Sequence, residues 1–318
     1  MKEGYFMDKI TEAMLQPLAL ESKNGCNVKI EILPNLGAQL KSFSLDGREM
    51  LFFSEEMLFS QQQAFTGCFL MFPTPCRLTD SKYNFGGKEI LQRKNGKDVF
   101  IHGLIRDETF IIKQGKDFLE ASIEIGINHP VYEGYPFPCR FIVKYEIIKN
   151  GLCISFNFEN QGKAPAPFGF GVHPFWQLED NRKDIAVKVP CEYVMELNNL
   201  IPTGKLNPVE GTTLDLRSWK ILENLSIDNV FYGRIPGEKG GIEWRREGFR
   251  LNIDSSPELT HMIAYIPEGQ SFACVENLTC SPNAPNLYSN GFKDESGLII
   301  VEPGKSYSGW ITWTVEKF

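Results

Sequence analysis

Two histidines and one glutamate stand in sequence surroundings that suit acid–base chemistry. His102 is followed by Gly103, and a glycine beside an imidazole allows a close approach of backbone or ligand. His173 lies among aromatic residues and glycines in the segment 168–176, a setting in which acid–base sites often occur. Glu276 follows an apolar run, where a buried carboxylate needs an ionic partner or a chemical role. A core position for His173 and a salt bridge for Glu276 are the structural alternatives.

Other kinds of site have little support in the sequence. His129 precedes a proline in a loop and His261 opens an apolar run, so we expect both to be structural. No two histidines are spaced i, i+2 or i, i+4, and no cysteines pair as CxxC, so no metal site is expected. The nucleophile elbow, the phosphate-binding loop and the dinucleotide fingerprint are all absent from the sequence. These absences disfavour the common hydrolase, nucleotide-binding and dinucleotide-binding classes.

Short alternating runs, separated by turn residues, must position these side chains. The run 28–32 alternates apolar and polar residues before the turn 34–37, which is typical of a hairpin. The runs 141–148 and 152–158 flank Lys149-Asn150-Gly151. Asn-Gly is a strong hairpin signal, because it fits the twist of two paired antiparallel strands. The sheets are therefore expected to be antiparallel.

Segments with helical periodicity are few. Residues 9–15, before Pro17, and residues 218–224 are the two places where we expect helical turns. No internal repeat, low-complexity tract or linker divides the chain. The pattern predicts an all-β fold, a large antiparallel β-sandwich with few short helices.

The composition of the 318 residues is that of a soluble globular protein. Hydrophobic residues make up 42% and charged residues 23%. The formal net charge of −7 argues against a dedicated nucleic-acid binder, which needs a basic face. No run of 18 apolar residues exists, and acidic residues interrupt the N-terminal segment, so we expect neither a membrane span nor a signal peptide. The eight scattered cysteines are expected to be free thiols, as in a cytoplasmic protein.

Several segments, taken in order, resemble motifs of the aldose 1-epimerase (galactose mutarotase) family. The resemblance covers the chain from about Asn27 to Phe318 and leaves residues 1–26 as an N-terminal extension of a single domain, 1–318. It implies the galactose mutarotase-like form of the β-sandwich, a supersandwich. The segments that carry it are 31–51, 75–78 with 85–88, 102–103, 172–176, 200–204 with 211–215, 227–231, 275–277 and 301–305.

The resemblance also implies a reaction, the interconversion of the α and β anomers of an aldose. Ring opening needs one base to remove the proton of the C1 hydroxyl and one acid to protonate the ring oxygen. By resemblance Glu276 is the base, His173 the acid, and His102 a hydrogen-bond partner on the ring-oxygen side. Usual pKa values suit these roles, because a carboxylate is ionised at pH 7 and an imidazole beside it can hold a proton.

The same resemblance assigns substrate contacts and partners. Arg77 and Asp228 would hold sugar hydroxyls, because paired polar groups fix the ring in one orientation. Neither a metal nor another cofactor is needed. The expected partner is a small-molecule aldose such as a hexose, with no nucleic acid and no membrane, and the protein would be a monomer or a homodimer.

Departures from the family pattern leave the sugar open. The family usually has Asn before the arginine and a second glycine after His-Gly, whereas this chain has Cys76 and Leu104. One branch, the hexose-6-phosphate 1-epimerases, surrounds the same acid–base pair with extra arginines. Arg106 and Arg140 are candidates for that role, unless they pair with surface acids. A non-catalytic sugar-binding protein is the other alternative, although it would not need an acid–base pair. A carbohydrate lyase or hydrolase is disfavoured, since no second catalytic carboxylate is evident near Glu276.

Overall fold

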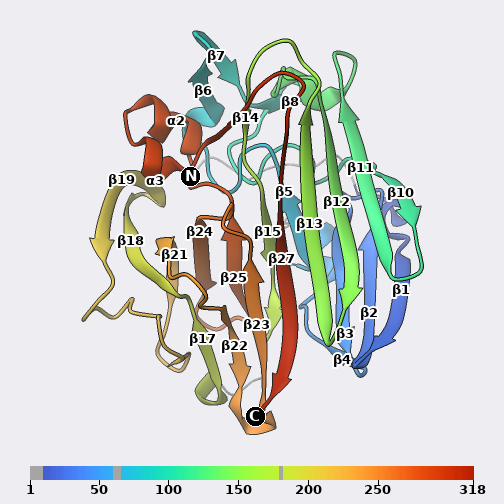
Figure 1. Ribbon diagram of the computed structural model, residues 1–318, viewed down its shortest axis with the longest axis vertical. Coiled ribbons are helices and arrows are strands. Elements are labelled where there is room, and N and C mark those ends of the chain that lie inside the picture. The colour runs from blue at the N-terminus through green and yellow to red at the C-terminus, as the bar shows by residue number, and fades with distance from the viewer. Residues whose placement is uncertain (1–9, 60–65, 179–181) are drawn as a thin grey trace.

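Two large antiparallel sheets pack face to face in the computed structural model, which describes residues 10–59, 66–178 and 182–318 (Figure 1). The first sheet follows the spatial order β1 (Leu18–Asn24), β2 (Cys26–Leu33), β3 (Gln39–Leu45), β5 (Cys68–Met71), β15 (Gly171–Pro174), β25 (Phe272–Leu278), β24 (His261–Ile266), β21 (Ile227–Arg234), β18 (Cys191–Asn198), β19 (Ile201–Pro208). Two short strands join it: β4 (Arg48–Glu49) pairs with β3, and β16 (Trp176–Gln177) pairs with β25.

The second sheet covers the core from the other side. Its spatial order is β10 (Ile111–Gln114), β11 (Phe118–Ile125), β12 (Cys139–Ile148), β13 (Gly151–Asn160), β27 (Ser306–Lys317), β23 (Phe249–Ser255), β22 (Gly240–Trp244), β17 (Ile185–Lys188), β20 (Lys220–Ile221). Three small ribbons complete the strands: β14 (Ala166–Phe168) with β26 (Ile299–Val301), β6 (Lys82–Phe85) with β7 (Lys88–Leu91), and β8 (Arg93–Lys94) with β9 (Lys97–Asp98).

Helices are short throughout the described residues, and none of them is long and apolar enough to cross a membrane. The α-helices are α1 (Glu55–Phe59), α2 (Ala284–Ser289) and α3 (Lys293–Ser296). The 3₁₀ helices are η1 (Glu12–Leu15), η2 (Thr79–Ser81), η3 (Pro130–Glu133), η4 (Arg182–Asp184) and η5 (Arg245–Glu247). The predicted all-β sandwich with few short helices is confirmed.

Alternation along the strands builds the core between the sheets. Every second residue of β12 is buried, from Cys139 to Ile147, because successive side chains of a strand point to opposite faces. Aromatic side chains join the two sheets: the Trp313 ring of β27 lies 5.6 Å from that of Phe43 and 4.7 Å from that of Trp176, centroid to centroid. Such large buried rings account for much of the hydrophobic stabilisation of a core.

The hairpin expected at Asn150-Gly151 is confirmed, since β12 and β13 pair from Cys139↔Asn160 to Ile148↔Gly151. The turn at 34–37 likewise joins the antiparallel strands β2 and β3. All eight cysteines are free.

Three segments differ from expectation. The predicted helical turn at 218–224 is wrong, because Lys220 and Ile221 extend to pair with Val187 and Ala186 at the edge of the second sheet. Of the helix expected at 9–15, the structure has only η1; residue 9 lies outside the described residues. Strand β1 pairs with β2 from Leu18↔Ile32 to Asn24↔Cys26, so residues 18–24 of the expected N-terminal extension are part of the first sheet.

Candidate active site

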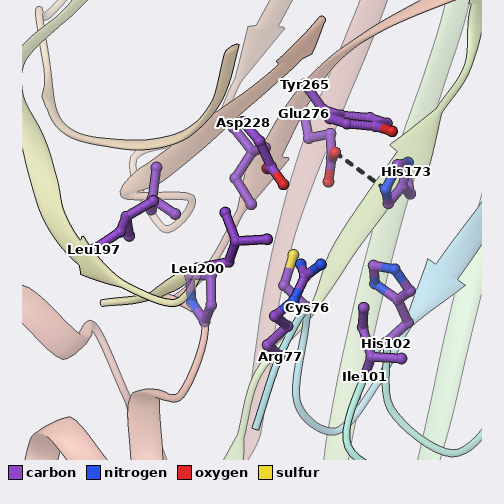
Figure 2. Close-up of a pocket in the computed structure, with 13 residues that line it drawn as sticks. Cys76, Arg77, Ile101, His102, His173, Leu197, Leu200, Asp228, Tyr265 and Glu276 are labelled. Atoms are coloured by element: carbon purple, nitrogen blue, oxygen red, sulfur yellow. Dashed lines mark ion pairs between the residues drawn. The ribbon is translucent and has the colours of Figure 1, made fainter. Parts of the chain in front are cut away.

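A pocket lies on the face of the first sheet that points away from the core (Figure 2). The alternation of β25 shows this arrangement, because Ala273 and Val275 pack into the core while Cys274 and Glu276 point to the opposite face. The five residues expected to act on a sugar all line this one pocket: Arg77, His102, His173, Asp228 and Glu276.

Strand register brings the expected acid and base together. His173 in β15 lies opposite Phe69 in β5, and Glu276 in β25 lies opposite Ile263 in β24. Because β15 and β25 are neighbours in the sheet, the imidazole and the carboxyl group meet although they are far apart in the sequence. His173 Nε2 is 3.3 Å from Glu276 Oε1, and the two side chains are 8% and 1% exposed.

One oxygen of this carboxyl group has an unused capacity to accept a hydrogen bond. Glu276 Oε2 is buried and has no hydrogen-bond partner among the described residues. A buried acceptor without a partner is costly, and native proteins keep few of them. A hydroxyl group entering the pocket would supply the missing hydrogen bond.

Burial controls the protonation of the pair. It lowers the pKa of His173 to about 3, with the positive charges of Arg106 and Arg77 acting in the same direction. It also raises the pKa of the Glu276 carboxyl group well above its usual range, and the nearby Asp228 adds to that rise. Both shifts favour the neutral forms, whereas usual pKa values suggested a carboxylate beside an imidazolium. The neutral pair and the ion pair hold the same single proton. The 3.3 Å contact between His173 Nε2 and Glu276 Oε1 allows this proton to pass between the two groups.

His102 is held against His173 by a tight loop. Its backbone has a φ of 63°, and the following Gly103 has a φ of 75°. A Cβ atom at Gly103 would overlap the carbonyl oxygen of Phe72, so only glycine fits this approach. The His102 ring packs edge-on to the His173 ring at 5.1 Å, and its Nδ1 lies 3.2 Å from the sulfur of Met71.

The protonation of His102 follows from its burial. Burial lowers its pKa well below the usual value, and the neighbouring His173 and the two arginines 106 and 77 act in the same direction. His102 is therefore neutral at pH 7, and a neutral imidazole offers one donor and one acceptor nitrogen.

Arg77 reaches the pocket from a loop that two other segments hold. Its backbone pairs with that of Ile101, next to His102, and the backbone amide of His102 donates to the Cys76 carbonyl at 2.7 Å. On the other side, the amide of Asn283 donates to the Arg77 carbonyl at 2.8 Å. The arginine and His102 are thus fixed relative to each other.

Asp228 enters from the far side of the pocket. It lies on β21 opposite Tyr265 of β24, and both side chains line the pocket. Burial raises the pKa of the Asp228 carboxyl group, and the positive charge of Arg77 opposes that rise. Figure 2 shows Arg77, Asp228 and Glu276 pointing into the same space.

The two arginines considered for phosphate contacts lie elsewhere. Arg106 is buried with its guanidinium carbon 4.0 Å from the centre of the Phe69 ring, and it does not line the pocket. Arg140 lies on β12 in the second sheet, with its Nε 3.9 Å from Glu124 on the neighbouring strand. The alternative of pairing with a surface acid therefore holds for Arg140.

The other two histidines have structural surroundings. His129 precedes η3, and its Nδ1 accepts a hydrogen bond from the amide of Val131. His261 is buried, with its Nε2 3.0 Å from the carbonyl oxygen of Glu295 and its Nδ1 2.9 Å from the Thr260 hydroxyl. Burial lowers the pKa of His261 to about 4.

Three side chains of the site could hold a metal ion. One ligand atom each of His173, Cys274 and Glu276 lies within 4.8 Å of the others. The sequence search for histidine pairs and CxxC pairs missed this group, because Cys274 and Glu276 share a face of one strand and the histidine comes from another. Burial raises the pKa of the Cys274 thiol well above its usual value, which opposes formation of the thiolate that metals bind.

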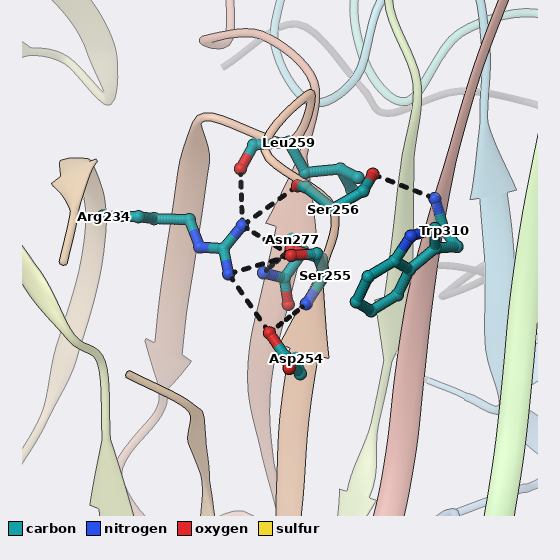
Figure 3. Close-up of polar contacts among 7 residues, drawn as sticks. All are labelled: Arg234, Asp254, Ser255, Ser256, Leu259, Asn277 and Trp310. Carbon is teal, nitrogen blue, oxygen red and sulfur yellow. Dashed lines mark hydrogen bonds and ion pairs between the residues drawn. The ribbon is translucent and has the colours of Figure 1, made fainter. Parts of the chain in front are cut away.

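A polar network anchors the strand of Glu276 from the core side (Figure 3). Asn277 donates from Nδ2 to the Ser255 hydroxyl of the second sheet at 3.0 Å. The carbonyl oxygens of Ser255, Ser256 and Leu259 accept hydrogen bonds from Arg234 at 3.0–3.3 Å. The guanidinium of β21 thus ties the loop after β23 to the sheet that carries the pocket.

Several pocket residues were not found from the sequence. Leu197, Leu200, Val230, Ile263 and Tyr265 line the pocket, but apolar residues in strands give no signal that separates a pocket wall from a core. The alternation of 261–266 and 227–231 could have shown which residues share a face with Glu276, had the strand order been known.

Comparison with known proteins identifies the family. The family model described as "Aldose 1-epimerase" matches residues 18–314. The chain belongs to the aldose 1-epimerase family. Its expected fold, the galactose mutarotase-like sandwich, is confirmed as well: a galactose mutarotase-like protein from Clostridium acetobutylicum superposes with a TM-score of 0.79 at 18% identity, covering 95% of this chain and 99% of that one.

Sequence relatives of this aldose 1-epimerase family member are distant. The uncharacterized protein YihR of Escherichia coli (strain K12) is 22% identical over 242 residues, which span 75% of each chain. The galactose mutarotase of Mus musculus is 25% identical over 146 residues, which span 44% of this chain and 42% of that protein.

Proposed function

We propose that this protein is an aldose 1-epimerase that interconverts the α and β anomers of a free aldose. The observation that carries the proposal is the contact of 3.3 Å between His173 and Glu276 in a pocket that Arg77 and Asp228 also line. One acid and one base in contact suit this reaction, because the hydroxyl oxygen and the ring oxygen of the sugar are both bonded to C1.

The proposed reaction uses one shared proton. Glu276 as carboxylate takes the proton of the C1 hydroxyl, whose oxygen then forms the aldehyde double bond as the bond from C1 to the ring oxygen breaks. The ring oxygen takes the proton of the His173 imidazolium. Rotation about C1–C2 and the reverse transfers close the ring from the other face. Ring opening leaves a carboxylic acid and a neutral imidazole, which is the form that burial favours.

The remaining polar residues position the sugar in this proposal. His102 would hydrogen-bond the ring-oxygen side, beside the His173 ring at 5.1 Å. Arg77 and Asp228 would hold ring hydroxyls, with donors from the guanidinium and acceptors from the carboxylate. No step needs a metal or another cofactor.

A free sugar is favoured over a sugar phosphate. A phosphate carries up to two negative charges and is usually bound by arginine or lysine. Among the described residues that line the pocket, Arg77 is the one basic side chain of this kind. Arg106 is covered by Phe69, and Arg140 belongs to the second sheet.

The test is the rate of anomer exchange, followed by NMR on α-glucose, α-galactose, their 6-deoxy forms and glucose 6-phosphate. We expect the wild type to accelerate exchange of free sugars, and Glu276→Gln or His173→Asn to lower kcat by about 10²- to 10⁴-fold, the usual contribution of positioned proton transfer. Glu302→Gln, at an exposed glutamate, is the matched control and should keep wild-type turnover.

Two outcomes would contradict the proposal. Acceleration of glucose 6-phosphate alone would indicate a hexose-6-phosphate 1-epimerase. Sugar binding without acceleration of any sugar would indicate a binding protein that has kept the fold.

A further inference from the structure

The floor of the pocket becomes apolar on one side of Glu276. The strand register sets Ile263 of β24 opposite Glu276, and Val230 of β21 opposite Ile263. Both side chains are buried and line the pocket. The row of neighbouring side chains that starts at Glu276 therefore continues across the sheet with two apolar residues, Ile263 and Val230.

Two leucines extend this apolar side. Leu197 and Leu200 come from the hairpin of β18 and β19, and Figure 2 shows them across the pocket from His173 and His102. The pairing of the hairpin changes register between Met195 and Leu197, shortly before the turn. We call Leu197, Leu200 and Val230 the apolar wall.

Leu200 occupies an unusual backbone position for its side chain. It is 41% exposed, and it forms the two-residue turn with Asn199, with φ values of 64° and 50°. Turns with two positive φ values strongly favour Asn-Gly, and a bulky residue at the glycine position is strained. Backbone strain that is retained at the mouth of a pocket is typical of a functional constraint. Here the strained turn places the Leu200 side chain at the pocket.

Polar side chains border the apolar wall, since Asp228 lies two residues before Val230 on the same face of β21. Arg77 comes from the loop that contacts Ile101, and Asp228 stands beside Tyr265. With C1 at Glu276 and ring hydroxyls on Arg77 and Asp228, as in the proposed function, the apolar wall remains for one further substituent. In an aldohexose, C6 is the position that carries a carbon outside the ring, so loss of its oxygen leaves a methyl group.

From this arrangement we propose that the substrate is a 6-deoxyaldohexose, whose methyl group packs against the apolar wall. This inference rests on the proposed epimerase function and names its substrate class. A hydroxymethyl group placed there would lose hydrogen bonds to water without gaining a partner from the three apolar side chains. A hydrophobic pocket discriminates against an added hydroxyl by at most about 100-fold, so we expect a preference of about 10- to 100-fold in kcat/KM.

The experiment compares two sugar pairs that differ only in the oxygen at C6: D-fucose with D-galactose, and D-quinovose with D-glucose. The kcat/KM for anomer exchange is measured by NMR for all four sugars. We expect the 6-deoxy sugar to be preferred in the pair that is turned over faster. Equal or faster turnover of both hexoses would overturn the inference while leaving the epimerase proposal intact. No acceleration of any of the four sugars would remove both.

Variants test whether the wall causes the preference. Leu200→Asn suits the positive φ and adds a polar group, so it should bring the ratio of 6-deoxy sugar to hexose toward 1. Leu197→Gln provides a second, independent change. Ile221→Asn is the matched control, because Ile221 is also 41% exposed but lies on β20 of the second sheet. An unchanged ratio in both wall variants would overturn the inference.

Discussion

The amide of Asn277 donates a hydrogen bond to the hydroxyl of Ser255 at 3.0 Å, and this bond joins the two sheets on the core side of Glu276. Two neighbouring residues of β25 thus point to opposite faces of the sheet: Glu276 faces the pocket, and Asn277 faces the core and holds the strand there. The carboxyl group of Glu276 is placed by packing on both faces of its strand.

Asn277→Ala should lower the free energy of unfolding by about 1–3 kcal/mol, the usual cost of leaving a buried polar partner unsatisfied. Urea denaturation measures it. Asn252→Ala is the matched control, because the Asn252 amide bonds an exposed Glu316 carboxylate, and it should change stability by no more than about 0.5 kcal/mol. Equal effects of the two substitutions would contradict a special role for Asn277.

The pH profile of kcat/KM should not fall near pH 6.5, where a histidine with its usual pKa loses its proton. The reaction needs one proton on the pair. With usual pKa values that proton would be lost above about pH 6.5. Here the raised pKa of Glu276 retains the proton at higher pH, and the pKa of about 3 at His173 keeps a second proton away until the solution is strongly acidic. We expect a plateau from pH 5 to above pH 7, after subtraction of the uncatalysed rate. A fall centred near pH 6.5 would show that the pair titrates as in water.

Gly103→Ala should destabilise the protein and reduce its activity, because the added methyl group would overlap the Phe72 carbonyl oxygen and displace His102. Gly47→Ala is a matched control: Gly47 also has a positive φ, 84°, but a Cβ there meets no atom within 4 Å. The control should lose about 1–2 kcal/mol from backbone strain alone. Thermal unfolding and kcat measured side by side should show a larger loss for Gly103→Ala in both. Equal losses would mean that the loop adapts.

Removal of metal ions should leave turnover unchanged. Prolonged dialysis against EDTA followed by NMR measurement of anomer exchange tests this expectation. Loss of activity that Zn²⁺ restores would instead indicate an ion held by His173, Cys274 and Glu276, and Cys274→Ser would then weaken the restoration.

The sequence predicted the fold class from local signals, and the family resemblance pointed to His173 and Glu276, whose side chains lie 3.3 Å apart in the structure. Alternating strands and the turn at Asn150 are visible in short windows, and His173 and Glu276 stand in distinctive segments. Other features depend on contacts between distant segments. The extended conformation of Lys220 and Ile221 comes from pairing with β17, and the neutral protonation of the pair comes from burial that no local pattern encodes. The apolar wall could be recognised only once the order of β24, β21 and β18 in the sheet was known, and the sequence does not give that order.

The position of β27 determines the order in which the sandwich can be completed during synthesis. This strand, red in Figure 1, lies between β13 and β23 and pairs with both along most of its length. Two parts of the second sheet are made earlier: β10 to β13, and the strands β17, β20, β22 and β23. Strand β27 cannot join them until residues 306–317 have been synthesised. A nascent chain that stalls before Ser306 would present two unpaired strand edges over an open core. Such edges recruit other chains, so we expect a truncation at residue 305 to aggregate rather than to fold with reduced stability.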